Sequence, residues 1–250
     1  MVLSMERWIG QVAVVTGASS GIGAAITEEL VVAGVKVVGL ARRKERIEEL
    51  SKKLSNKKGK LYSLKCDVTI EQEILKAFQW IDENVGHPQI LINNAGIVQK
   101  NTLTDGDTAA WKKVFDVNVF GLLITSREII RILKKTNLPG HIVNINSVAG
   151  HISLNFPGMN VYPASKFAVT SITDYTSKEL LFEKINNIKV TSVSPGVTKS
   201  EIIDANMDEA LQHMPIMPAQ EVADSVLYVL STPQHVQVDE LIIQPLFEGF

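Results

Sequence analysis

A tyrosine and a lysine four residues apart, Tyr162 and Lys166, carry side chains that could transfer a proton. On an α-helix, residues at this spacing point to the same side. A phenol with a pKa near ~10 exchanges its proton poorly at neutral pH, but a fixed ammonium group beside it favours the phenolate and lowers that pKa. The pair would then be a general acid–base for an alcohol or a carbonyl group. Tyrosine and lysine also meet at this spacing as ordinary neighbours on helix surfaces, so the interpretation depends on the rest of the chain.

A glycine-rich segment, residues 16–23 (Thr-Gly-Ala-Ser-Ser-Gly-Ile-Gly), could bind a phosphate group. It follows a β-branched run and precedes a segment for which we predict a helix. Glycine lets the backbone turn sharply and approach a pyrophosphate without a Cβ clash. The N-terminus of a helix offers that anion free N–H groups and the positive end of a dipole. The alternative is a tight strand-to-helix turn that binds no ligand.

Short apolar runs alternate with longer amphipathic segments along the whole chain. The apolar runs predict strands at residues 12–15, 35–40, 61–65, 90–92, 141–145, 188–193 and 241–243. The other segments predict helices at residues 21–33, 43–55, 71–84, 107–136 (continuous or broken), 162–183 and 219–230. Continuous apolar strands are typical of a parallel sheet covered on both faces. We therefore predict an α/β, doubly wound parallel sheet in one domain, residues 1–250, whose ligands bind where the turns after the first, fourth and sixth strands converge.

Composition limits the classes of function. The chain has 250 residues, 45% of them hydrophobic, and a formal net charge of −2, which argues against nucleic acid as the main partner. Cys66 is the only cysteine, so no intrachain disulfide framework forms. We find no signal peptide and no run that approaches the ~20 apolar residues of a membrane span. We expect a soluble cytoplasmic protein with no integral membrane segment and no metal site, and peripheral membrane contact stays open.

The chain is similar to the short-chain dehydrogenases/reductases in six motifs, which follow the family's order over nearly the whole length. The motifs are residues 16–23 with the spacing Gly-x-x-x-Gly-x-Gly, the sequence Asn-Asn-Ala-Gly at 93–96, Asn118, Ser147, the Tyr162/Lys166 pair and Pro195-Gly196. The resemblance implies a compact single domain of the Rossmann type. It also implies hydride transfer between a nicotinamide cofactor and an alcohol or carbonyl group.

The resemblance implies a role for each catalytic residue. Tyr162 would protonate a carbonyl oxygen in reduction or take the hydroxyl proton in oxidation, and Lys166 would lower the pKa of Tyr162 and hold the nicotinamide ribose. Ser147 would donate a hydrogen bond to the substrate oxygen and stabilise charge that develops there. Asn118 would hold a water that links Lys166 to solvent. Taken alone, Asn118 could instead cap or kink a helix, and Ser147 could be a turn hydroxyl.

The resemblance also implies which residues contact the cofactor. Asp67 and Val68 would lie by the adenine, Asn93 and Gly96 would line the cofactor channel, and the residues after Pro195 would contact the nicotinamide. The implied contacts are Gly17, Ser19, Ser20, Gly21, Ile22, Gly23, Arg42, Arg43, Asp67, Val68, Asn94, Ala95, Gly96, Tyr162, Lys166, Pro195, Gly196, Val197 and Thr198.

The end of the second predicted strand indicates which nicotinamide cofactor is used. An acid at this point accepts hydrogen bonds from the ribose 2′-OH of NAD and repels a 2′-phosphate. Here the position is Ala41, and Arg42 and Arg43 follow. Guanidinium groups bind phosphate through paired, charge-assisted hydrogen bonds. We therefore predict NADP(H) rather than NAD(H), the alternative being that both arginines only solvate the start of a helix.

Two segments should surround the substrate. Ser147 and Tyr162 are slightly further apart than is usual in the family, and the extra residues fall in the loop 151–160, which should edge the pocket. His151 and His213 rank below Tyr162 as acid–base groups and are interpreted as exposed loop residues. The segment 197–218 should cover the site with an adaptable apolar wall or, alternatively, pack on the core. Its apolar residues are Ile202, Ile203, Met207, Leu211, Met214, Ile216 and Met217.

Within the family, residues 5–8, 38–43, 140–147 and 230–233 are similar to a subgroup that contains insect farnesol dehydrogenases. That similarity implies NADP-linked oxidation of a farnesol-type isoprenoid alcohol, a small apolar substrate. Two alternatives stay open: a broad carbonyl reductase or hydroxysteroid dehydrogenase, and a non-catalytic NADPH-binding regulator. The family also implies a homodimer or homotetramer that packs through the helices 107–136 and 162–183.

Overall fold

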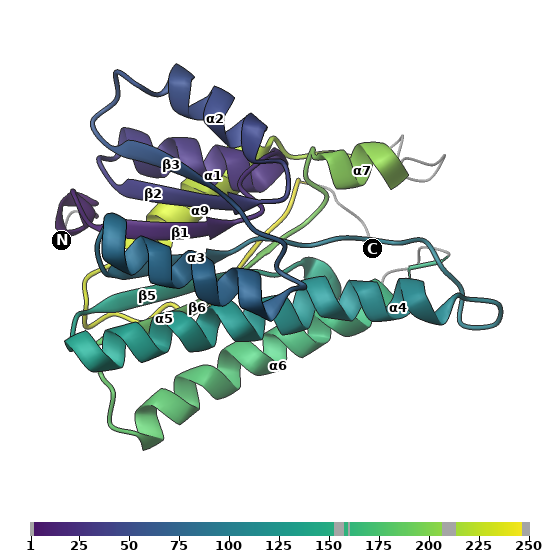
Figure 1. The fold of residues 1–250 in the computed structure, drawn as a ribbon. Coiled ribbons are helices and arrows are strands. Elements are labelled where there is room, and N and C mark those ends of the chain that lie inside the picture. Colours follow the sequence, from purple (N-terminus) through teal and green to yellow (C-terminus); the bar gives the residue numbers. More distant parts are fainter. Residues whose placement is uncertain (1–2, 153–157, 160, 207–213, 247–250) are drawn as a thin grey trace.

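The computed structural model describes residues 3–152, 158–159, 161–206 and 214–246. Its centre is a parallel β-sheet (Figure 1), with the strand order β3-β2-β1-β4-β5-β6-β7 within these ranges. The strands are β1 (Val12–Thr16), β2 (Lys36–Ala41), β3 (Lys60–Lys65), β4 (Pro88–Asn93), β5 (Gly140–Ile145), β6 (Ile188–Pro195) and β7 (Glu240–Ile243). Every predicted strand is confirmed. The chain crosses from β3 over β1 to β4, which makes this the strand order of a doubly wound Rossmann fold.

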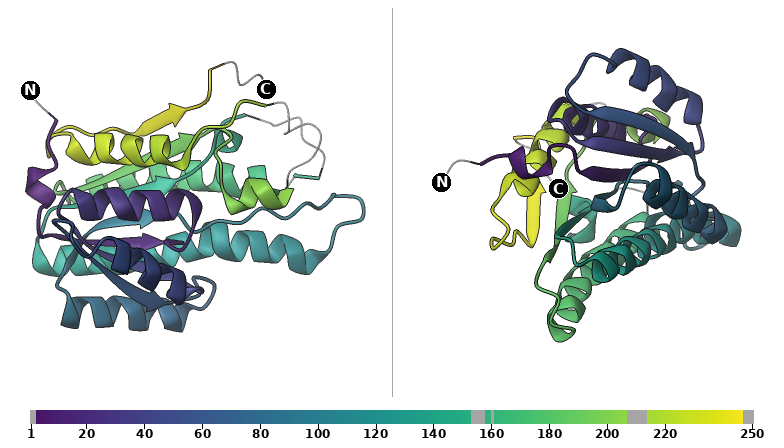
Figure 2. Two further views of the ribbon diagram at one scale, coloured as in Figure 1. Left: turned by 90° about the horizontal axis from the view of Figure 1, so that it is seen from above. Right: turned by 60° about the vertical axis from the view of Figure 1, so that its left-hand side comes forward.

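Helices cover both faces of the sheet (Figures 1 and 2). On one face lie α1 (Gly21–Val32), α2 (Lys44–Lys53) and α9 (Ala219–Ser231). On the other face lie α3 (Glu71–Asn84), α4 (Thr108–Phe115), α5 (Leu122–Thr136) and α6 (Val161–Phe182). No helix in the described part of the chain is long and apolar enough to cross a membrane.

Successive strand residues alternate between two hydrophobic cores, because side chains of a strand point to opposite faces of the sheet. In β1, Ala13 and Val15 pack in the core beneath α1 and α9. Val12 and Val14 pack in the core beneath α3 and α5. All five residues of β1 are buried. The unbroken apolar runs of the sequence are thus explained by burial on both faces.

The predicted helix 107–136 is helical throughout but not uniformly α-helical. Asp107 caps its start by accepting hydrogen bonds from the backbone N–H groups of Ala109 and Ala110. Between α4 and α5, Asp116–Gly121 forms a π-helix. A π-helical turn holds one extra residue and changes the direction in which the following side chains point. This turn contains Asn118, one of the predicted site residues.

Within the described residues, three short helices escaped the sequence prediction because they have too few residues to show a repeated amphipathic pattern. They are η1 (Glu6–Trp8), η3 (Val148–Gly150) and α7 (Glu201–Asn206). In η1, the indole Nε1 of the buried Trp8 donates a hydrogen bond of 2.8 Å to the carbonyl oxygen of Leu230, which ties this segment to α9. Helices η3 and α7 both lie at the carboxyl edge of the sheet and contribute residues to the pocket described next.

Candidate active site

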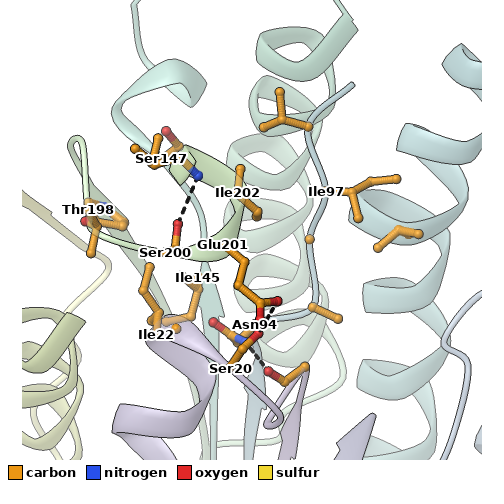
Figure 3. Close-up of a pocket in the computed structure, with 18 of the residues that line it drawn as sticks. Ser20, Ile22, Asn94, Ile97, Ile145, Ser147, Thr198, Ser200, Glu201 and Ile202 are labelled. Carbon is orange, nitrogen blue, oxygen red and sulfur yellow. Dashed lines mark hydrogen bonds between the residues drawn. The ribbon is translucent and has the colours of Figure 1, made fainter. Parts of the chain in front are cut away.

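A pocket of about 840 Å³ lies at the carboxyl edge of the sheet, where the turns after β1, β4 and β6 converge as predicted (Figure 3). Of the residues proposed for catalysis or cofactor binding, all but Gly23, Asn93 and Asn118 line it. Figure 3 shows Ser20 and Glu201 together at one end of the pocket and Ser147 at the other. The residues expected to bind phosphate and the residues expected to bind the substrate oxygen therefore occupy different parts of one cavity.

The glycine-rich turn is held in place by residues from β4. The Thr16 hydroxyl accepts hydrogen bonds of 3.0 Å from the backbone N–H groups of both Asn94 and Ala95. The Asn94 side-chain amide donates in return to the carbonyl oxygen of Thr16, at 2.9 Å. Gly17 has a φ of +67°, a conformation that favours glycine. The turn leads directly into α1, whose first N–H groups are free to bind an anion.

Gly23 lies behind this turn and does not line the pocket. A Cβ at Gly23 would stand 2.3 Å from both the Asn94 amide nitrogen and the Gly17 carbonyl oxygen. This glycine therefore serves the close packing of α1 against the turn, rather than contact with a ligand.

Asn93, which the family resemblance placed in the cofactor channel, points into the protein interior instead. Its amide nitrogen donates to Ser126 and to Asn144, both at 2.9 Å. Its amide oxygen accepts a hydrogen bond of 2.6 Å from Thr125. The neighbouring Asn94 lines the pocket in its place, because successive residues at the end of a strand face opposite ways.

Lys166 is buried behind Tyr162 on the first turns of α6. Its ammonium group donates a hydrogen bond of 2.9 Å to the carbonyl oxygen of Ile145, the last residue of β5. Its Nζ lies 5.8 Å from the centre of the Tyr162 ring. Burial lowers the pKa of Lys166 to about 8, because removal from water disfavours the charged form.

The pKa of Tyr162 differs from the expectation. The residue is partly exposed on the pocket wall, and the protein that surrounds its ring and hydroxyl reduces contact with water, which raises the pKa. A hydrogen bond with the Ser147 hydroxyl lowers the pKa and partly offsets the effect of burial. In the protein chain by itself burial is the larger effect on the Tyr162 pKa, and the lowering of that pKa by Lys166 stays a prediction. Ser147 is the group that favours the phenolate here.

Asn118 is buried in the π-helical turn and acts on the backbone around the pocket. Its side-chain oxygen accepts a hydrogen bond of 2.8 Å from the Ile97 N–H group, and its amide nitrogen donates to the Ile97 carbonyl at 3.0 Å. The same nitrogen donates to Ser165, whose hydroxyl donates to the carbonyl oxygen of Tyr162. Asn118 thus fixes the segment after β4 to the start of α6.

The two arginines at the end of β2 differ in their surroundings. Arg42 is exposed, lines the pocket, and forms no ion pair with a residue that the structure describes. Arg43 is only half exposed and forms an ion pair with Glu201 at 2.6 Å. Arg46, one turn into α2, pairs with the same carboxylate. Arg46 and Glu201 were absent from the sequence prediction because nothing in the sequence signals a pair separated by more than 150 residues.

The structure gives different outcomes for the loop histidines and for the apolar residues predicted to cover the site. His151 is partly buried, not an exposed loop residue as predicted, and its ring Nε2 forms a hydrogen bond of 2.9 Å with the Ser194 hydroxyl. It does not line the pocket. Ile202 and Ile203 line the pocket, whereas Met217 is buried in the core. The predictions for Met207, Leu211 and His213 lie outside the described residues.

Comparison with known proteins agrees with this geometry. A family model for short chain dehydrogenases matches residues 11–210. The sequence is 47% identical to a farnesol dehydrogenase of Aedes aegypti, over 98% of this chain and 100% of that protein. It is 40% identical to dehydrogenase/reductase SDR family member 11 of Homo sapiens, over 96% of each chain.

Solved structures give the same result. A short-chain type dehydrogenase/reductase from Mycobacterium marinum matches with a TM-score of 0.88 at 27% identity over 95% of both chains. The closed form of a serine dehydrogenase complexed with NADP⁺ matches with a TM-score of 0.86 at 27% identity, over 96% of this chain and 97% of the other. The family model matches most of the chain, and Ser147 and Tyr162 line the same cavity as the glycine-rich turn. The chain therefore belongs to the short-chain dehydrogenases/reductases.

Proposed function

We propose that this oxidoreductase transfers a hydride between NADP(H) and an apolar alcohol or carbonyl compound, with a farnesol-type isoprenoid alcohol as the preferred substrate. One observation carries the proposal: the hydroxyl groups of Ser147 and Tyr162 share a cavity with the glycine-rich turn and Arg42. The two hydroxyl groups suit an alcohol or carbonyl oxygen, and the turn and the arginine suit a phosphorylated dinucleotide.

The residues of the pocket fit a dinucleotide that carries a 2′-phosphate. A Cβ at Gly17 would stand 2.9 Å from the Asn94 amide nitrogen, so only glycine leaves the turn as close to β4 as it is. Ala41 stands where an acid would bind the 2′-OH of NAD, and Arg42 follows without an ion-pair partner among the described residues. The similar serine dehydrogenase, which was solved in complex with NADP⁺, supports this assignment.

Tyr162 and Ser147 supply the proton chemistry in this proposal. When bound, the cofactor supplies or accepts the hydride. In alcohol oxidation, the Tyr162 oxygen takes the hydroxyl proton, and in carbonyl reduction the Tyr162 hydroxyl returns it. Ser147 holds the same substrate oxygen and stabilises the negative charge that develops on it.

Lys166 and Asn118 keep these groups in position. The buried Lys166 ammonium is anchored by the Ile145 carbonyl, which holds its Nζ on the pocket wall, 5.8 Å from the centre of the Tyr162 ring. Asn118 connects Ile97, on one wall, through Ser165 to the backbone of Tyr162. We infer that Asn118 acts as a positioning residue for the start of α6.

The apolar part of the pocket lining supports an apolar substrate. Apolar side chains from four different segments line the cavity: Ile97, Val98, Val148, Met159, Ile202 and Ile203. Such a wall, with only a few polar groups, is typical of sites for apolar ligands. The farnesol dehydrogenase at 47% identity favours an isoprenoid alcohol. The same wall would also accept a keto-steroid or another apolar ketone, which keeps the carbonyl reductase as the second candidate.

The first experiment compares substrates and cofactors on the purified protein. We expect farnesol to be oxidised with NADP⁺ in preference to NAD⁺, and Arg42→Asp to reduce this preference, since it replaces the guanidinium by a charge that repels phosphate. Spectrophotometric rates with farnesol, a keto-steroid and a small aromatic ketone provide the measurement. Reduction of the ketones without farnesol oxidation would favour the carbonyl reductase, and cofactor binding without any turnover would favour the non-catalytic regulator.

Replacing Tyr162 by phenylalanine tests the acid–base assignment. We expect turnover to fall by roughly 100-fold or more, because the variant lacks the group that exchanges the substrate proton. NADPH binding, followed by fluorescence, should remain. Tyr175→Phe is the matched control, since Tyr175 is 68% exposed on the same helix and its change should leave turnover intact. Turnover retained by Tyr162→Phe would exclude the mechanism.

The pH profile of Ser147→Ala tests the link between Ser147 and the Tyr162 pKa. Oxidation needs the deprotonated tyrosine, so its rate should rise with pH through the Tyr162 pKa. Because the Ser147 bond lowers that pKa, its loss should move the rise to higher pH as well as reduce the rate. Ser225→Ala, on the distant helix α9, should leave the profile unchanged. An unshifted profile in Ser147→Ala would show that Ser147 does not tune the tyrosine.

We also propose that the protein forms a homodimer or homotetramer through α5 and α6, which lie on the same face of the sheet (Figure 1). Large apolar side chains are exposed on α6, among them Leu181 at 74% and Phe182 at 85%. Exposed apolar patches mark interaction surfaces. Analytical ultracentrifugation should give a mass two or four times the 27.5 kDa of one chain. A stable single-chain species would contradict the proposal.

A further inference from the structure

Three donors from two separate segments hold the carboxylate of Glu201 at the arginine end of the pocket. The Ser20 hydroxyl donates to it at 3.1 Å, and Arg43 donates to the same oxygen at 2.6 Å. Arg46 donates to the other oxygen. Arg43 also donates to Ser20 at 3.0 Å, so the donors form one connected group. Figure 3 shows the Glu201 side chain reaching Ser20 from the start of α7.

These donors form an anion site that the chain fills with its own side chain. Two guanidinium groups and a hydroxyl are the combination that binds phosphate in proteins. The donors lower the pKa of Glu201 to about 2, so Glu201 is a carboxylate at any working pH. The site also lies at the cofactor end of the cavity, because Ser20, Arg43 and Glu201 line it together with Arg42.

The contact is exchangeable rather than a fixed part of the core. The side chains of Arg43 and Glu201 are 42% and 47% exposed, and ion pairs in such positions are weak because water competes for both partners. A phosphate group carries up to two negative charges against the single charge of a carboxylate. It would therefore compete effectively with Glu201 for the same guanidinium groups.

We propose that Glu201 is a cofactor-specificity residue: an internal anion that occupies the site made by Ser20, Arg43 and Arg46, and that a ribose 2′-phosphate must displace. The proposal rests on the NADP(H) assignment made above. Arg42 is the cation that receives the phosphate without such competition. Glu201 consequently lowers the affinity for a 2′-phosphorylated nucleotide and leaves that for its unphosphorylated counterpart unchanged.

Calorimetric titration with two nucleotide fragments tests this competition without any turnover. The probes are adenosine 2′,5′-bisphosphate and 5′-AMP, which differ only in the 2′-phosphate. We expect Glu201→Gln to tighten binding of the bisphosphate by roughly threefold to tenfold, the range that loss of a few exposed ion pairs gives. Binding of 5′-AMP should not change. Glu201→Ala should behave like Glu201→Gln, which guards against an effect of the introduced amide.

Glu28→Gln is the matched control for net charge. Glu28 is exposed on α1, outside the pocket, and its replacement removes the same single charge. An equal gain in bisphosphate affinity in Glu28→Gln and Glu201→Gln would overturn the proposal. Weaker bisphosphate binding in Glu201→Gln would also overturn it, because Glu201 would then orient the arginines for phosphate. If the wild type binds both fragments equally well, the NADP(H) assignment itself fails. If the wild type prefers the bisphosphate but Glu201→Gln brings no gain, only the role of Glu201 fails.

Discussion

The contact between the ends of β1 and β4 is the constraint on which the rest of the site depends. These strands are far apart in sequence, yet they are neighbours in the sheet, and Thr16 and Asn94 exchange hydrogen bonds where both strands end. This contact fixes the glycine-rich turn, and the turn in turn sets the start of α1. Because Gly23 leaves no space between α1 and Asn94, a shift of β4 would be transmitted directly to the phosphate end of the pocket.

The pKa values of Tyr162 and Lys166 depend on a balance between burial and hydrogen bonding. Burial opposes ionisation of both Tyr162 and Lys166, since it raises the pKa of the phenol and lowers that of the ammonium group. The Ser147 hydroxyl and the Ile145 carbonyl each stabilise the charged form of one partner. The net shifts differ in sense: the pKa of Lys166 falls toward neutral pH, whereas the pKa of Tyr162 lies above its ordinary value despite the Ser147 bond. In the protein chain itself, the serine contributes more to this balance than the spacing of tyrosine and lysine suggests.

The sequence predicted the features that repeat locally and missed those that depend on distant partners. Strands buried on both faces are visible as unbroken apolar runs, and the glycine-rich turn is visible because its positive φ angles, at Gly17 and Gly21, favour glycine. The π-helical turn at Asn118 left no such mark, since one inserted residue barely changes the amphipathic pattern. Which of the two neighbours, Asn93 or Asn94, lines the pocket depends on the exact residue at which β4 ends. The pairing of Glu201 with Arg43 and Arg46 depends on how α7 is placed by the completed fold.

The strand order also affects how the chain emerges during synthesis. β1 lies between β2 and β4, and β4 ends only at residue 93. Until that point has left the ribosome, one edge of β1, apolar on both faces, has no partner strand. An open, apolar edge of this kind is a template for pairing with other chains. The arrangement that brings two remote turns together at the pocket therefore leaves this edge of β1 open to pairing with other chains until β4 has emerged.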